Sequence, residues 1–211
     1  MQVTGSKDKK TTPSRLSIRI PSGQSLHCGC GNELSAGSAV ELLFEGWEVV
    51  PYPKALGEEL DLTALLSTAG IALREDDRVV SIEGEGAINY ALRLSAESAK
   101  AVEELQGRGV SVTFATPLAR CVTRAIVGTR RPKTVVLALL GGAAHIAYSD
   151  HKHLEYAEAM PLNGEEELIN LLAHLNQDYE LRKARFVLLG KESWAHYKTL
   201  RSYFRRVSRE E

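Results

Sequence analysis

The sequence has little cysteine, no long apolar run and almost no net charge, and each shortage excludes a class of protein. Only three of the 211 residues are cysteines, too few and too unevenly placed for a disulfide framework, so we expect a reducing, cytoplasmic setting. No apolar run approaches the roughly 20 residues that cross a bilayer, and the polar first 14 residues lack the apolar core of a signal peptide. A formal net charge of −1 gives no bulk attraction to nucleic acid or to an acidic membrane.

What is present is an ordinary globular composition, with 44 % hydrophobic and 25 % charged residues, which is enough apolar material for a core. From Arg15 onward, strand-like and helix-like apolar patterns alternate. We expect Asp61 to cap one helix, Ser95 to cap a second, and Pro117 to occupy the first position of a third. Strands are expected at residues 15–20, 24–29, 39–44, 47–52, 78–83, 88–95 and 110–116.

The stretch GTRRPK (128–133) interrupts this pattern and predicts a linker. The pattern then starts again, with strands expected at 134–141, 144–150, 153–162 and 184–190, and with helices expected from residue 163 and over 192–207. The predicted organisation is a disordered lead-in at 1–14, a first subdomain at 15–128, a linker at 129–133 and a second subdomain at 134–211.

Both halves show the element order β-β-β-α-β-α, and the first half carries an additional strand and helix. Three antiparallel strands followed by alternating helix and strand are typical of a ribonuclease H-like unit. Two tandem ribonuclease H-like units form an actin-like ATPase fold. We therefore predict an α/β protein with this fold, by analogy of element order.

Several stretches also resemble a known bacterial family. They are LSIRI (16–20), VPYPKALGEEL (50–60), FATPLA (114–119) and the block from VVLALLGGAAHIAYSD to FVLLG (135–190). These stretches are similar to the family catalogued as domain of unknown function 3822, over nearly the whole chain after Arg15. The resemblance implies an actin-like ATPase fold, distantly similar to pilus-assembly actin homologues, and it implies no particular activity.

An actin-like ATPase holds phosphate with two Asp-x-Gly hairpins, in which backbone N–H groups bind oxygens and aspartates position Mg²⁺ and water. In the second hairpin of this chain Gly141 and Gly142 are present, but Ala138 and His145 stand at the positions of the acids. The interpretation favoured by this pattern is a tight β-turn without metal chemistry.

The other two nucleotide motifs are also incomplete. The first hairpin would place its acid near Arg19 and Pro21, and a proline has no N–H to offer a phosphate. The double glycine that normally lies beside the adenosine is reduced to Gly190, followed by Lys191. Arg19 and Lys191 could attract an anion, but a hydrolytic metal site or a ribonuclease site lacks its carboxylates.

Three further groups invite a functional interpretation, and for each a structural one is favoured. His27, Cys28 and Cys30 lack the second ligand pair of a zinc site. His151 and His153 lie at a polar hairpin tip, where a solvated turn is expected. The cation-rich segment after Lys191 could form an RNA- or partner-binding face, but an amphipathic terminal helix with cations at its C-terminal end is preferred.

Two hypotheses follow. The preferred one is a non-enzymatic cytoplasmic scaffold or interaction protein, with no catalytic residue, no metal, no expected cofactor and an unknown protein partner. The alternative is a nucleotide-binding protein or weak ATPase, with ATP held in the cleft between the halves. In that case the cofactor-binding residues would be Arg19, Gly141, Gly142, Gly190 and Lys191.

Overall fold

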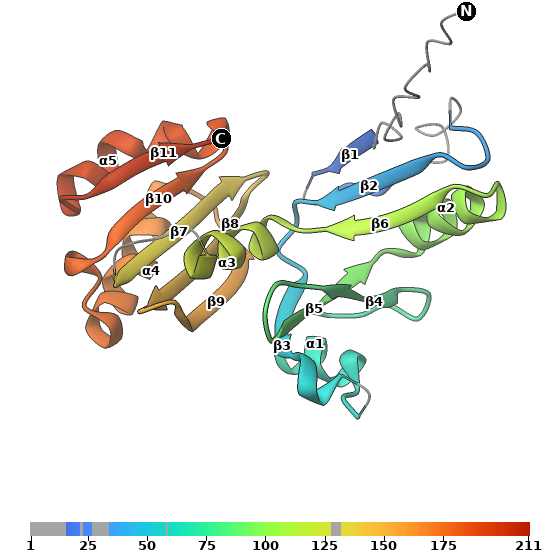
Figure 1. Ribbon diagram of the computed structural model, residues 1–211, viewed down its shortest axis with the longest axis horizontal. Helices are drawn as coiled ribbons and strands as arrows, with labels where there is room; N and C mark the ends of the chain where they lie inside the picture. Colours follow the sequence, from blue (N-terminus) through green and yellow to red (C-terminus); the bar gives the residue numbers. More distant parts are fainter. Residues whose placement is uncertain (1–15, 22, 27–33, 58, 128–131) are drawn as a thin grey trace, which may run out of the picture.

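The computed structural model describes residues 16–21, 23–26, 34–57, 59–127 and 132–211 of the chain. Figure 1 shows two parts, each built on β-sheet, which meet where helix α3 (Pro117–Val127) lies. The predicted lead-in and most of the predicted linker lie outside the described residues. The division into subdomains therefore stays a prediction.

The second half is built on one five-stranded sheet with the strand order β11-β10-β7-β8-β9. β7, β8 and β9 form an antiparallel meander, β10 runs parallel to β7, and β11 runs parallel to β10. The three antiparallel strands followed by a helix and β10 have the element order predicted for a ribonuclease H-like unit, whereas β11 was not predicted. The elements are β7 (Lys133–Leu140), β8 (Ala143–Asp150), β9 (His153–Pro161), α4 (Glu165–Tyr179), η3 (Leu181–Lys183), β10 (Arg185–Leu189), η4 (Lys191–His196), α5 (Tyr197–Tyr203) and β11 (Val207–Glu210).

Helices cover both faces of this sheet, and the sequence of β7 shows why. Alternate residues of a strand point to opposite faces, and a strand buried on both faces is apolar throughout. Val135 and Leu137 belong to a core with α4 and α5, whereas Val136 and Ala138 belong to a core with α3. Although α3 lies in the predicted first subdomain, it therefore packs against the sheet of the second.

The connection between β7 and β8 is a two-residue hairpin turn made by Gly141 and Gly142. Both glycines have positive φ angles, 57° and 74°, and Leu140 pairs directly with Ala143 across the hairpin. Two-residue hairpins with φ above zero at both positions twist in the same sense as the strands that flank them. The glycines are therefore required by the backbone of the turn.

The first half contains two sheets of three strands each. The first has the order β1-β2-β6 and is parallel throughout, and the second has the order β3-β5-β4 and is antiparallel. Their core is closed by α2, and α1 packs beside β3 and β5 (Figure 1). The elements are β1 (Leu16–Ile20), β2 (Ala39–Phe44), β3 (Val49–Pro53), η2 (Lys54–Leu56), α1 (Leu62–Thr68), β4 (Arg78–Glu83), β5 (Ile88–Leu94), α2 (Ala96–Gly107) and β6 (Ser111–Ala115).

Two predictions for the first half are wrong, one about a strand and one about the pairing of two strands. Residues 24–26 form no strand, and the rest of the strand expected at 24–29 lies outside the described residues. The strands at 39–44 and 47–52 were expected to flank a tight connection at Glu45-Gly46, but β2 and β3 belong to different sheets. The amide of Glu45 donates to the carbonyl of Ile20 (2.9 Å). The chain therefore stays beside β1 for one residue after β2 ends, and only then turns away.

The end of the chain also differs from the expected helix over 192–207. The structure has the 3-10 segment η4, the seven-residue helix α5 and then strand β11. The buried Ser193 hydroxyl accepts from Leu139 N (2.8 Å) and holds η4 against β7. Phe204 leaves the helical conformation to stack on Phe186, with ring centroids 4.0 Å apart. In the described part of the chain no helix is long and apolar enough to cross a membrane.

Candidate functional site

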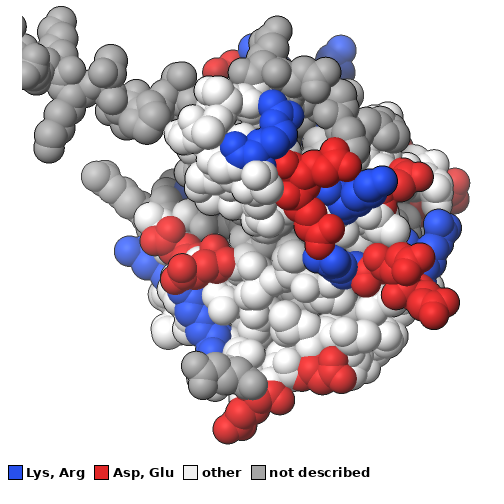
Figure 2. Space-filling model, turned by 90° about the vertical axis from the view of Figure 1, so that its right-hand side faces the viewer, with Lys and Arg blue, Asp and Glu red and all other residues white. Residues whose placement is uncertain are grey.

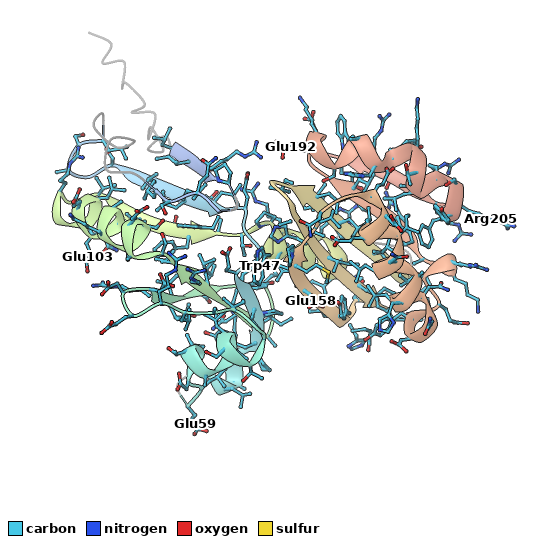
Figure 3. The ribbon with its side chains drawn as sticks, turned by 180° about the vertical axis from the view of Figure 1, so that it is seen from behind. Trp47, Glu59, Glu103, Glu158, Glu192 and Arg205 are labelled. Atoms are coloured by element: carbon cyan, nitrogen blue, oxygen red, sulfur yellow. The ribbon has the colours of Figure 1, made fainter. Side chains whose placement is uncertain are left out.

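A cleft of about 1070 Å³ lies between the two halves. The carboxyl ends of the parallel strands β1, β2 and β6 open into it from the first half, and the ends of β7 and β10 open into it from the second. Ligands of open α/β sheets bind at carboxyl ends of strands, so this cleft is the candidate site. Figure 3 shows Glu192 of η4 at the junction of the halves, pointing toward the strands of the first half.

The walls of the cleft are largely apolar, and its charged residues are mostly acidic. Leu43, Phe114, Ala138 and Leu140 are among the apolar lining residues. The charged lining residues are six glutamates (Glu41, Glu45, Glu83, Glu85, Glu192 and Glu211) and four basic residues (Arg19, Arg120, Arg124 and Lys191). An anion that enters the cleft therefore meets more carboxylates than cations.

Arg19 connects the two halves through ion pairs. Its Nε donates to the buried carboxylate of Glu45, and its other end donates to both carboxylate oxygens of Glu192, at 2.9 and 3.1 Å. These bonds, above all the one to Glu45, raise the pKa of the Arg19 guanidinium above its ordinary value. Arg19 belongs to β1 and Glu192 to η4, so the pair spans the cleft between segments 173 residues apart.

The other three cations of the cleft are also paired with glutamates. Arg124 of α3 donates to both oxygens of Glu210, at 2.5 and 2.7 Å, and these bonds lower the pKa of the Glu210 carboxyl. Arg120 lies 3.4 Å from Glu41, and Lys191 lies 3.3 Å from Glu211. Each basic side chain that lines the cleft thus has a glutamate carboxylate of the same chain within 3.4 Å.

His145 fills the space beneath Glu45. Its ring is fully buried, and its Nε2 lies 3.1 Å from the carbonyl oxygen of Glu45, which fixes Nε2 as the donor. Burial lowers the pKa of His145 to about 4, and the bond to Glu45 opposes that shift only in part. His145 is therefore neutral at neutral pH and joins the second sheet to the first half.

The structure brings three of the five predicted cofactor-binding residues to the cleft. Arg19, Gly190 and Lys191 line it, whereas Gly141 and Gly142 form an exposed turn outside its lining. The amide of Gly190 donates to the carbonyl of Glu210 (2.9 Å), so this N–H is not free for a phosphate. Whether any of the five residues binds a nucleotide stays a prediction.

The residues proposed and rejected as metal ligands are placed only in part. His27, Cys28 and Cys30 lie outside the described residues. His151 and His153 are exposed at the turn between β8 and β9, where His151 Nδ1 lies 2.7 Å from Asp150. Within the ranges that the structure describes, no three histidine, cysteine or acidic side chains are grouped to hold a metal ion.

Glu45, Glu192 and Glu210 pair with arginines that line the cleft, and none of the three is predicted from the sequence. Each lies at the end of a strand or in a short 3-10 segment, and each meets its arginine only through the tertiary fold. No motif surrounds them, so no local sequence signal identifies them. Their common chemistry becomes visible only when the two halves are placed together.

Comparison with solved structures gives the fold its name. A Bacteroides thetaiotaomicron protein described as having an actin-like ATPase fold and unknown function aligns with a TM-score of 0.66 at 14 % identity, over 82 % of this chain and 68 % of its own. A chain of a PilM–PilN type IV pilus biogenesis complex aligns with a TM-score of 0.49 at 14 % identity, over 82 % and 69 %. No family model and no curated protein matches the sequence.

The likeness to the Bacteroides protein shows that this chain is a mixed α/β protein with an actin-like ATPase fold, as predicted. At this identity the likeness concerns the fold alone. The resemblance to the family of domain of unknown function 3822 stays a prediction, because no family model matches.

Proposed function

We propose that this protein is a non-catalytic interaction protein, a degenerate member of the actin-like ATPase fold whose cleft receives a segment of a partner protein. One observation carries the proposal: all four cations that line the cleft are already paired with glutamates of the same chain. The proposal includes a cytoplasmic setting and no cofactor.

A nucleotide triphosphate is a poor match for this arrangement. Its phosphates would face six lining glutamates and would have to compete for guanidinium groups that already hold carboxylates. Removing one partner from a buried pair leaves an uncompensated charge, which is strongly unfavourable when the remaining group is as buried as Glu45. Hydrolysis would further need Mg²⁺ ligands, and Ala138 and His145 supply none.

A protein segment matches the cleft better in size and chemistry. The volume of about 1070 Å³ is at the upper end for a small-molecule site, and much of its wall is aliphatic or aromatic. Apolar side chains of a partner could cover Leu43, Phe114 and Leu140, and polar or basic groups could meet the glutamates at the rim. The cleft would then serve as a docking groove.

The alternative is a nucleotide-binding protein or weak ATPase that uses Arg19, Gly190 and Lys191. In its favour, these residues lie together at the cleft of a fold that binds nucleotides in active members. It requires Arg19 to leave Glu192 or to hold a phosphate beside it.

Thermal unfolding with and without Mg·ATP separates the two functions. A ligand present at about 100 times its Kd stabilises the folded state by about 2.7 kcal/mol, so binding would raise the Tm measurably. We expect no change in Tm with Mg·ATP, Mg·ADP or Mg·GTP. A rise in Tm that needs Mg²⁺ would establish the alternative and refute the proposed function.

Partner binding is tested by filling the cleft. Thr123→Trp places an indole in the cleft from α3, and Thr63→Trp places one on the exposed face of α1 as a matched control. In quantitative affinity capture from the native cells, at least one protein should bind the wild type and the Thr63→Trp variant but not the Thr123→Trp variant. Equal recovery of every captured protein by all three baits would show that the cleft is not a docking groove.

A further inference from the structure

The C-terminal segment carries a second charged surface that the cleft does not explain. We call it the cationic face, and it consists of Lys198, Arg201, Arg205, Arg206 and Arg209. All five side chains are exposed, and no acidic residue occurs in the sequence between Glu192 and Glu210. Among the described residues none of the five forms an ion pair. They therefore differ from every cation of the cleft.

Of these cations only Arg201 lies in the last turn of α5, where the helix dipole favours a positive charge. A helix C-terminus favours cations only within its last turn, and α5 ends at Tyr203. Arg205 and Arg206 lie after the helix, and Arg209 lies in β11. For these three arginines the helix dipole offers no explanation.

The cations follow one another along α5 and the segment after it, since Arg209 lies over Tyr197, which precedes Lys198 at the start of α5. Lys198 and Arg201 lie three residues apart on α5 and are therefore neighbours, about 5–6 Å apart on the helix surface. Arg205 lies after the helix, and its backbone carbonyl accepts from the Arg201 guanidinium (2.6 Å), which keeps the two residues side by side. Figure 3 shows Arg205 at the end of the second half, pointing away from the first half.

Two aromatic features accompany the charges. The guanidinium of Arg209 lies over the ring of Tyr197, 4.8 Å from its centroid, and over Trp194 at 5.4 Å, so this cation is held in a fixed orientation. Tyr203, in the last turn of α5, exposes 58 % of its surface, more than most aromatic residues of a folded protein. Such a ring offers a flat apolar surface beside the arginines.

We propose that the cationic face binds single-stranded nucleic acid. Four of its five cations are arginines, whose planar guanidinium groups bind phosphate in a bidentate manner. An exposed tyrosine provides a surface on which an unpaired base can stack, and basic residues with interleaved aromatics are the combination that single-strand binding surfaces use. Acidic side chains would use only the charges, whereas a nucleotide uses the charges with its phosphate and the exposed ring with its base. This inference does not depend on the function proposed for the cleft.

Fluorescence anisotropy with a fluorescein-labelled 12-nucleotide oligouridine tests the proposal. If all five cations contact phosphates, the slope of log K against log salt concentration is about −3.5, since each contact on a single strand contributes about −0.7. Affinity should then fall about 100-fold between 50 and 200 mM salt. Absence of binding at 50 mM salt would overturn the proposal.

Variants separate local contacts from net charge. Arg205→Gln/Arg206→Gln should reduce the magnitude of the slope by about 1.4. The control Lys100→Gln/Lys152→Gln, which changes the net charge equally at exposed positions elsewhere, should leave the slope unchanged. Tyr203→Leu should lower affinity about fivefold or more at fixed salt without altering the slope, because stacking is lost and no charge is removed. Circular dichroism and Tm measurements confirm that each variant is folded.

Two results would contradict this assignment. If the control pair weakens binding as much as the arginine pair, attraction is a long-range charge effect and not a site. If a 12-residue oligoglutamate competes as well as unlabelled oligouridine, and Tyr203→Leu has no effect, the surface recognises acidic peptides and the nucleic-acid proposal is wrong.

Discussion

The cleft and the cationic face both contain arginine and lysine, but they use these residues in opposite ways. In the cleft, Arg19 and Arg124 pair with glutamates that come from distant parts of the chain. On the cationic face, Arg205 and Arg206 have no acidic partner within the described residues. Counting cations along the sequence would give the two regions a similar affinity for anions, whereas their pairing gives them opposite roles.

The cleft is also a joint between the two halves, because Arg19 of β1 holds Glu192 of η4. In our proposal the phosphate hairpins lack their acids, and Glu45, Glu192 and Glu210 pair with Arg19 and Arg124. His145 is the clearest example of a contact that joins the halves, because its ring is buried and bonds to the backbone of the first half. In our proposal the cleft keeps its shape and takes a different kind of partner.

The largest expected effect is a loss of stability at acidic pH caused by His145, which bonds to the backbone of Glu45 in the first half. Because burial lowers the folded-state pKa to about 4 from an ordinary value of 6.5, the unfolded chain binds more protons between these pH values. The free energy of unfolding therefore contains a contribution from neutral, buried His145 that is complete above pH 6.5. This contribution decreases by up to about 3 kcal/mol as the pH falls toward 4.

The measurement is the free energy of unfolding in urea at pH 7.0 and pH 4.5, for the wild type and for His145→Gln. The amide nitrogen of glutamine can donate to the Glu45 carbonyl but does not titrate. We expect the loss of stability between these pH values to be smaller in the variant. Identical losses in both proteins would show that His145 is not protonated on unfolding.

The second expected effect concerns Arg19. Arg19→Met leaves the carboxylate of Glu45, only 4 % exposed, without its partner, and should destabilise the protein by about 2 kcal/mol. Arg78→Met is the matched control, because Arg78 pairs with Glu103 where both side chains are more than half exposed. Exposed pairs contribute little, so the control should change the free energy of unfolding by less than about 0.5 kcal/mol. Equal effects in the two variants would mean that the pair at the cleft is no more than a surface contact.

The third expected effect concerns the glycine turn. Gly142→Ala forces a positive φ of 74° on a residue with a side chain, although a Cβ atom there meets no neighbour. We expect a loss of about 1 kcal/mol from backbone strain alone. Gly107→Ala, in α2 where φ is helical, should be neutral or stabilising. If Gly142→Ala abolished partner capture without altering stability, the turn would be part of a binding site after all.

Local signals in the sequence predicted much of the fold. Asp61 accepts from Thr63 N and Ala64 N at 2.9 and 3.1 Å, as a helix cap does, and Ser95 caps α2. Strands β2 and β4 have their predicted boundaries, because their β-branched and apolar residues lie between clear turn signals. The order of elements was then enough to predict the fold class by analogy.

Strand pairing and the chemistry of the cleft could not be predicted in the same way. Nothing local decides that β1 runs parallel to β2, or that Glu45 ends one sheet instead of turning into the next. The bond between His145 and Glu45 joins residues 100 positions apart, and it exists only because the halves pack together. A comparison of motifs along the sequence therefore does not identify which residues pair across the cleft.

The smallest expected effect is on the cationic face, and it completes the comparison with the cleft. Arg206 is exposed and has no acidic partner in the described structure, so Arg206→Met should change the free energy of unfolding by less than about 0.5 kcal/mol. Arg19→Met replaces the same residue type and should cost several times as much, although both variants lose one positive charge. Urea unfolding of the two variants at one pH measures the contrast directly. If Arg206→Met instead destabilised the protein by more than about 1 kcal/mol, this arginine would have a structural partner, and the cationic face would no longer be free to bind an anion.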